Sequence, residues 1–173
     1  MRRPLVAASW AAAMALTGCG YHLAGRADRL PRHIQTIAIT AFSNATTRHR
    51  LTEGLPAALT REFLSRTRYQ IVADPSQADA VLRGAILNYV SYPTVFDPAT
   101  ARAAGVQLSV TLQITLTDRT TGAVLFSRPH FEVRERYEIA VDQRAYFEES
   151  EAALERLCRD AARSIVSAIR ENF

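Results

Sequence analysis

Residues 106–117 alternate between apolar and polar side chains without interruption. A period of two is the side-chain period of a β-strand, whereas a helix of about 3.6 residues per turn would scatter these apolar residues around its surface. The segment therefore predicts a strand with one buried and one wetted face, in a sheet that is covered on one side only. The predicted buried face carries Val106, Leu108, Val110, Leu112, Ile114 and Leu116.

Two segments have the helical repeat that could provide this cover. Apolar residues recur three or four positions apart in residues 51–63 and again within residues 145–171, which predicts two amphipathic helices. The apolar stripes are Leu51, Leu55, Ala58, Leu59 and Phe63 in the first helix, and Leu154, Leu157, Cys158, Ala161, Ile165 and Ile169 in the second.

Pro56 leaves the start of the first helix open, because proline inside a helix removes a hydrogen bond and can kink it. A start capped by Thr46 or Thr47, with a kink at the proline, is favoured because Leu51 already fits the apolar stripe. The alternative is a cap at Thr52, which would place the proline near the first turn.

Three further segments predict strands. Residues 34–42 are rich in β-branched side chains, residues 81–90 form a longer apolar run, and residues 123–137 return after a hairpin turn. Gly84 within the second predicts a bulge or a close backbone approach, and Pro129 within the third predicts an irregularity or an edge. Residues 118–122 predict a hairpin turn. The predicted fold is a single α+β domain, residues 34–173, in the order β-α-β-β-β-α. It is a two-layer sandwich in which two helices pack on one face of a mixed sheet of about four strands.

The segment 92–105 interrupts the strand pattern with two prolines and a glycine and predicts a long loop. Loops of this length in compact domains are usually functional or disordered. Val95 and Phe96 lie where solvent would be expected, which makes the loop a candidate contact for a partner.

The N-terminus resembles the signal peptide of a bacterial lipoprotein. Two arginines precede a thirteen-residue apolar run, residues 4–16, which is too short for a membrane span of about 20 residues. The run ends in Leu-Thr-Gly-Cys at residues 16–19, which resembles a lipobox. The resemblance implies that residues 1–18 are cleaved, that Cys19 is lipidated and anchors the protein to a membrane, and that residues 19–33 form a tether.

Motifs of catalysis and cofactor binding are absent from the sequence. It contains no G-x-S-x-G, phosphate loop, dinucleotide fingerprint or H-E-x-x-H, and its four histidines are scattered. We therefore expect no enzyme activity, no cofactor and no metal site. The formal net charge of +4 falls to +2, from 19 arginines and 17 acidic residues, once Arg2 and Arg3 are removed, so nucleic-acid binding is not expected.

Arginine supplies every basic side chain other than histidine, which either a GC-rich genome or a preference for phosphate partners would explain. The polar strand face and nearby arginines would suit an amphiphile that bears phosphates. The candidate anion contacts are Arg102, Arg128, Arg134 and Arg136. The alternative is that these arginines are solvated charges paired with Glu132, Glu135 and Glu138.

Three stretches together resemble the LptE family of outer-membrane lipoproteins: Cys-Gly-Tyr-His-Leu-Ala-Gly at residues 19–25, residues 37–51 from Ile-Ala-Ile through Phe-Ser-Asn-Ala-Thr-Thr, and Ala-Asp-Ala-Val-Leu-Arg-Gly at residues 78–84. The resemblance implies a protein without catalytic activity that sits in the lumen of the LptD β-barrel, binds lipopolysaccharide and helps to assemble it at the outer leaflet. The barrel-contact loop would include Tyr92, Pro93, Val95, Phe96 and Pro98.

The location implied by this resemblance is the outer membrane, with the domain facing the periplasm, because Gly20 is not the aspartate that signals retention in the inner membrane. A lipoprotein that regulates a cell-wall synthase is the alternative, since such proteins share the Ile-Ala-Ile strand and Phe-x-Asn turn. A tether that spans at most about 50 Å favours a partner in the same membrane.

Overall fold

The computed structural model describes residues 30–98, 102–139 and 143–172. Cys19 and the predicted signal peptide lie outside the described residues. The elements follow the order β1 (Thr36–Ile39), β2 (Ser43–Asn44), α2 (Arg50–Arg66), β3 (Gln70–Val72), the short 3-10 helix η1 (Pro75–Gln77), β4 (Ala80–Phe96), β5 (Ala103–Asp118), β6 (Val124–Glu138) and α3 (Gln143–Glu171).

These strands form one mixed sheet in the order β3-β1-β4-β5-β6, and β2 pairs with β4 beside β1. β1 pairs in parallel with both β3 and β4, and β2 pairs in parallel with β4, whereas β4, β5 and β6 form an antiparallel meander. The predicted α+β fold with a mixed sheet is confirmed. The sheet of the described residues has six strands rather than about four, because β2 and β3 are too short to show a periodic pattern.

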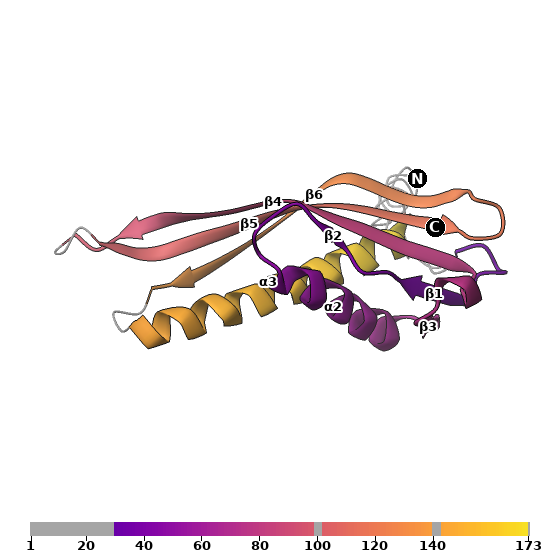
Figure 1. The fold of residues 1–173 in the computed structure, drawn as a ribbon, viewed down its shortest axis with the longest axis horizontal. Helices are drawn as coiled ribbons and strands as arrows, with labels where there is room; N and C mark the ends of the chain where they lie inside the picture. The colour runs from indigo at the N-terminus through magenta and orange to yellow at the C-terminus, as the bar shows by residue number, and fades with distance from the viewer. Residues whose placement is uncertain (1–29, 99–101, 140–142, 173) are drawn as a thin grey trace, which may run out of the picture.

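Both helices lie on one side of the sheet, and no other described helix covers the opposite side (Figure 1). The six apolar residues predicted to face inward along β5 are all buried, and so are the apolar stripes of α2 and α3. Together they form one hydrophobic core between the sheet and the helices. The two-layer arrangement is therefore stabilised mainly by burial of apolar surface, at about 25 cal/mol per Å².

The helix α2 begins at Arg50, later than the favoured start near Thr46 or Thr47 and earlier than Thr52. The Asn44 side chain explains the delay. Its Oδ1 accepts from the Thr46 amide at 2.8 Å, and its Nδ2 donates to the Arg48 carbonyl at 3.0 Å. These bonds hold residues 44–48 in a turn, so both predicted starts were wrong, and Pro56 lies inside the helix.

The predicted loop at 92–105 was also wrong in most of its length, since β4 continues to Phe96 and β5 begins at Ala103. The position of Pro93 explains this. Beyond Ile86, β5 is the one strand partner of β4 within the described part of the chain, and it lies on one side. Pro93 lies opposite Val106, one of the positions of β5 whose backbone groups face β6 rather than β4, as the bond from the Ile139 amide to the Ala104 carbonyl shows. A proline there costs no bond to β5.

The irregularities predicted at Gly84 and Pro129 can be compared with the side-chain packing and the strand register. A Cβ at Gly84 would collide with the ring of Phe42, so this glycine permits the close approach that was one of its two predicted roles. The register of β4 with β5 shifts instead between Ile86 and Asn88, and again between Pro93 and Val95 and between Val95 and Phe96. In β6, the register with β5 shifts across Pro129, which confirms the predicted irregularity.

Candidate functional site: the open face of the sheet

The uncovered side of the sheet, here called the open face, carries polar side chains from three neighbouring strands. Residues directly opposite one another in antiparallel strands have side chains on the same face. The register therefore places on the open face Asn88, Val90 and Tyr92 of β4, Gln107, Ser109 and Thr111 of β5, and Glu132, Arg134 and Arg136 of β6.

Tyr92, Gln107 and Arg136 form a hydrogen-bonded row across the open face. The Gln107 Nε2 donates to the Tyr92 hydroxyl at 2.6 Å, and the Arg136 Nε donates to Gln107 Oε1 at 3.1 Å. Gln107 is only 7% exposed, so both ends of its amide are satisfied where water has little access. The row holds the Arg136 guanidinium against a neutral partner, and its positive charge remains available to an anion.

Ser109, Glu132 and Arg134 form the next row. The Ser109 hydroxyl donates to Glu132 Oε1 at 2.5 Å, and Arg134 donates to both oxygens of Glu132 at 3.0 and 2.9 Å. The hydrogen bond from Arg134 lowers the pKa of Glu132, and the same bond raises the pKa of Arg134. The two side chains are 45% and 62% exposed, so this pair contributes little stability and can exchange partners with a ligand.

The four arginines proposed from the sequence do not form one cluster. Arg134 and Arg136 lie two residues apart on one face of β6, which places them about 7 Å from each other. Arg128 lies beyond the register shift, opposite the buried Ile114, and its guanidinium stands 5.9 Å from the centroid of the Phe126 ring. Arg102 is exposed at the far end of the β4–β5 hairpin, where its carbonyl accepts from the Asp97 amide at 2.8 Å.

The carboxylates proposed as alternative partners of these arginines, Glu132 and Glu135, pair with different residues. Glu132 pairs with Arg134. Glu135 instead lies 2.6 Å from the Nε of Arg156 on α3. The Glu135 contact therefore ties β6 to the last helix and leaves the charge of Arg136 on the open face.

A hollow of about 470 Å³ lies at the other end of β4 and β5. Four of its eight lining residues have hydroxyl or amide side chains, and Arg83 is the basic residue among them. Sequence reasoning missed Arg83, because one arginine in an apolar strand gave no sign of which face it would occupy. Its pairing with Thr115 in the register is the signal that places it. The hollow is lined by Thr40, Ala41, Ser43, Arg83, Gly84, Ala85, Gln113 and Thr115.

The end of the β4–β5 hairpin is apolar and exposed. Val95 and Phe96 are 56% and 58% exposed, and Tyr92 is 42% exposed, while Pro93 and Pro98 are also exposed. This end lies on the left of Figure 1, away from β1 and β3. These exposed apolar side chains make the hairpin end a candidate contact surface.

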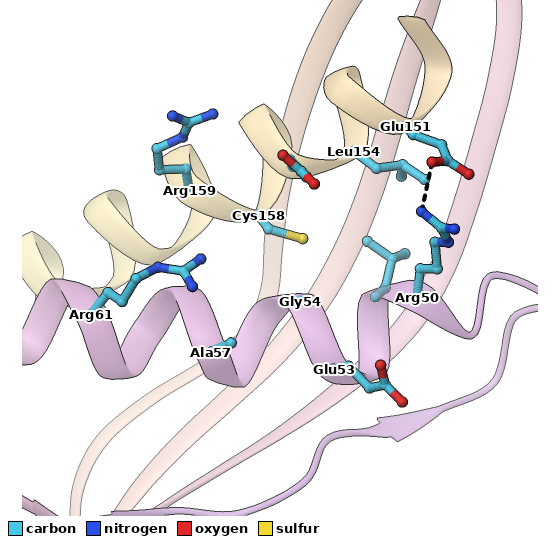
Figure 2. Close-up of a pocket in the computed structure, with 11 residues that line it drawn as sticks. Arg50, Glu53, Gly54, Ala57, Arg61, Glu151, Leu154, Cys158 and Arg159 are labelled. Atoms are coloured by element: carbon cyan, nitrogen blue, oxygen red, sulfur yellow. Dashed lines mark ion pairs between the residues drawn. The ribbon is translucent and has the colours of Figure 1, made fainter. Parts of the chain in front are cut away.

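A second depression, of about 730 Å³, lies between α2 and α3 (Figure 2). Arg50 and Glu151 pair across it at 2.8 Å. Cys158 lies at its floor, where its Sγ would be 3.1 Å from a Cβ at Gly54. Burial raises the pKa of the Cys158 thiol to about 11, so this thiol is a packing group rather than a nucleophile.

Among the residues that the structure describes, no group of three or more His, Cys, Asp or Glu side chains is placed to hold a metal ion. Within the same part of the chain, no helix combines the length and the apolar character that a membrane span requires.

Known structures share this fold. A lipoprotein from Caulobacter crescentus CB15 is 19% identical with a TM-score of 0.55, over 78% of this chain and 87% of that one. Rare lipoprotein B from Shewanella oneidensis is 19% identical with a TM-score of 0.51, over 78% and 92%. A PelC dodecamer from Paraburkholderia phytofirmans is 15% identical with a TM-score of 0.52, over 79% and 87%. Likeness at these identities shows the fold alone.

Comparison with curated proteins gives no match. The model of the LptE family, described as lipopolysaccharide-assembly, matches residues 34–169. This range includes the six strands and nearly all of α3. The chain therefore belongs to the LptE family of lipopolysaccharide-assembly proteins.

Proposed function

We propose that this protein is an outer-membrane lipoprotein that binds lipopolysaccharide on the open face of its sheet and works as the partner of an LptD-like β-barrel. In this proposal Cys19 carries the lipid anchor, the domain faces the periplasm and enters the barrel lumen, and no chemical reaction is catalysed. The observation that carries the proposal is the family match across the sheet and helices. The open face and the hairpin end supply the two surfaces that such a role needs.

The open face fits a glycolipid that bears phosphates. Guanidinium groups bind phosphate oxygens through parallel N–H bonds, and Arg134 and Arg136 lie side by side on β6, opposite Ser109 and Gln107 of β5. Hydroxyl and amide side chains beside them can bond to sugar hydroxyls. The surface is therefore polar where a headgroup would lie, and this argues against Arg128, which lies opposite Ile114, as a member of the same site.

The binding role can be tested with the double variant Arg134→Glu and Arg136→Glu, measured against purified lipopolysaccharide at low and high salt. Two charge reversals on adjacent sites should weaken binding roughly tenfold or more at low salt, because exposed ion pairs are strongest there. Arg163→Glu on α3 is the matched control, since Arg163 is exposed on the helix side and pairs with Asp160. Unchanged affinity of the double variant at both salt concentrations would exclude these contacts.

The partner role can be tested at the hairpin end. A photo-crosslinking amino acid at Val95 or Phe96 should capture a large outer-membrane barrel, because both side chains are exposed. The competing function is regulation of a cell-wall synthase across the periplasm. Capture of such a synthase by the same two positions would favour that function over the present proposal.

A further inference from the structure

The outer half of β4 is a sheet edge that no other described strand covers. At residues 80–86 its outer side pairs with β1 and β2, and the Ala45 amide donates to the Ile86 carbonyl at 3.0 Å. Beyond Ile86, among the described residues, β4 has only β5 as a strand partner. A strand edge of this kind presents a row of backbone donors and acceptors to another chain.

The register identifies which backbone groups face outward. Backbone groups of opposed residues in an antiparallel pair point either toward each other or away. The Ile86 carbonyl points outward, and the register shift between Ile86 and Asn88 then moves the alternation by one residue. Tyr89, Ser91 and Pro93 therefore direct their backbone groups away from β5. Pro93 supplies a carbonyl only, which is why a proline is accepted there.

The side chains along this edge are unusual for an edge strand. Natural sheets block their edges with charge and proline, and β6, at the other end of the same sheet, carries Arg128, Pro129, Glu132, Arg134, Glu135, Arg136 and Glu138. Residues 87–96 of β4 contain no charged residue and one proline. The outer half of β4 therefore carries no charge that would repel a pairing strand, and its interruptions are Pro93 and the register shifts between Pro93 and Phe96.

We propose that the edge of β4 at residues 89–96 is a strand-addition site, which takes an extended, uncharged segment of the partner protein as an extra strand. The added strand would continue the row that β1 and β2 occupy on the same side of β4. Val90, Tyr92 and Phe96, each at least 42% exposed, would pack against its side chains. In strand addition, backbone bonds provide affinity and the alternate side chains provide specificity.

A second copy of the chain fits this edge less well. Two identical β4 edges paired around Ser91 would set Pro93 of each copy against Tyr89 of the other, where proline has no amide to donate. The Arg48 guanidinium lies 4.9 Å from the centroid of the Tyr89 ring. The Arg48 side chains of both copies would therefore lie close to the paired edges. The geometry thus favours a segment of a different protein. The inference rests on the proposed function for the identity of that partner.

Hydrogen exchange at single amides tests this site directly. Exchange would be compared between the free protein and the complex that it forms in detergent extracts of the outer membrane. The Ser91 amide should exchange quickly in the free protein and slowly in the complex. The Val90 amide, which faces β5, is the internal control and should be protected in both. This measurement uses the unmodified sequence and does not depend on any variant folding.

Two variants at residue 91 test the hydrogen bond that the Ser91 amide would donate to the added strand. Ser91→Pro removes an outward amide at a position equivalent to Pro93, so the fold should accept it, and co-purification of the partner should fall roughly tenfold or more. Ser91→Ala loses only the hydroxyl and should co-purify as the wild type does. Thermal unfolding of both variants, measured alone, checks that they fold.

The outcomes separate this inference from the proposed function. If a barrel co-purifies but Ser91 exchanges quickly and Ser91→Pro binds normally, strand addition is wrong and the proposed function stands. If Ser91 is protected in a complex with a protein other than a barrel, strand addition stands and the proposed function is wrong. Protection by a second copy, or the absence of any complex, would overturn the strand-addition site as stated.

Discussion

The His33 Nε2 and the Asp118 Oδ2 lie 2.8 Å apart, and this contact joins the segment before β1 to the turn between β5 and β6. The Asp118 side chain is only 3% exposed, and its Oδ1 accepts from the amides of Thr120 and Thr121 at 2.8 and 3.1 Å. The bond to His33, followed by those to the turn, lowers the pKa of Asp118 to about 2.

This contact predicts an acid-dependent loss of stability. Because the pKa of Asp118 falls from 3.8 to about 2 on folding, folding favours the carboxylate. Its contribution is present above pH 4 or so and is lost as the pH falls toward about 2. Thermal unfolding between pH 5 and pH 2 should show a smaller loss of Tm in Asp118→Asn than in the wild type. Glu53→Gln, an exposed site on α2, is the control; equal pH slopes for wild type and Asp118→Asn would refute the role.

Asn44 predicts a stability effect at the start of α2. Its side chain bonds to the Thr46 amide, the Arg48 carbonyl and the Thr52 hydroxyl. Asn44→Ala should lower the free energy of unfolding by about 0.5–2 kcal/mol, as loss of a capping side chain does. Asn44→Asp keeps the acceptor for the Thr46 amide and loses both donated bonds, so urea unfolding should place it between wild type and Asn44→Ala. Full stability of Asn44→Ala would show that the turn forms without this side chain.

Gly84 predicts a compensated pair of substitutions with Phe42. A methyl group at residue 84 collides with the Phe42 ring, and overpacking of this kind costs roughly 1–3 kcal/mol. Gly84→Ala should therefore destabilise the protein, and adding Phe42→Leu should recover part of the loss because the smaller side chain makes room. A double variant whose loss equals the sum of the two single losses would show that the two residues do not interact.

The alternation along β5 and the stripes of α2 and α3 could be predicted because burial repeats with the period of the element itself. The burial of residues such as Leu112 and Leu157 could therefore be predicted from their spacing alone. The extension of β4 through Pro93 could not be predicted in this way. It depends on which way one amide points, and that is fixed by pairing with β5 rather than by local sequence. The two-residue strand β2 likewise exists only through its parallel pairing with β4.

The candidate site was predictable in part for the same reason. Arg134 and Arg136 alternate along one strand, so their shared face follows from the sequence. Their separation from Arg128 does not, since the register shift across Pro129 moves Arg128 out of line. Arg83 was missed because its place on the open face depends on its pairing with Thr115.

Cys19 predicts the mode of membrane attachment. If its sulfur and amine carry acyl chains, Cys19→Ala should release the protein into the soluble fraction, because two or more chains are needed for a firm anchor. Fractionation of membranes, together with the mass of the mature N-terminal peptide, checks this. Membrane association of the wild type with no acyl mass on that peptide would rule out the lipid anchor.

The central claim, a partnership with an outer-membrane barrel in lipopolysaccharide assembly, is tested most directly by one measurement. The protein would be purified under mild conditions from detergent-solubilised outer membranes, and the co-purifying chain and lipid identified by mass spectrometry. We predict that an LptD-like β-barrel and lipopolysaccharide both co-purify with the wild type. The amounts recovered should fall in the double variant Arg134→Glu and Arg136→Glu and in the variant Ser91→Pro. Recovery of a cell-wall synthase, or of neither barrel nor lipopolysaccharide, would contradict the account.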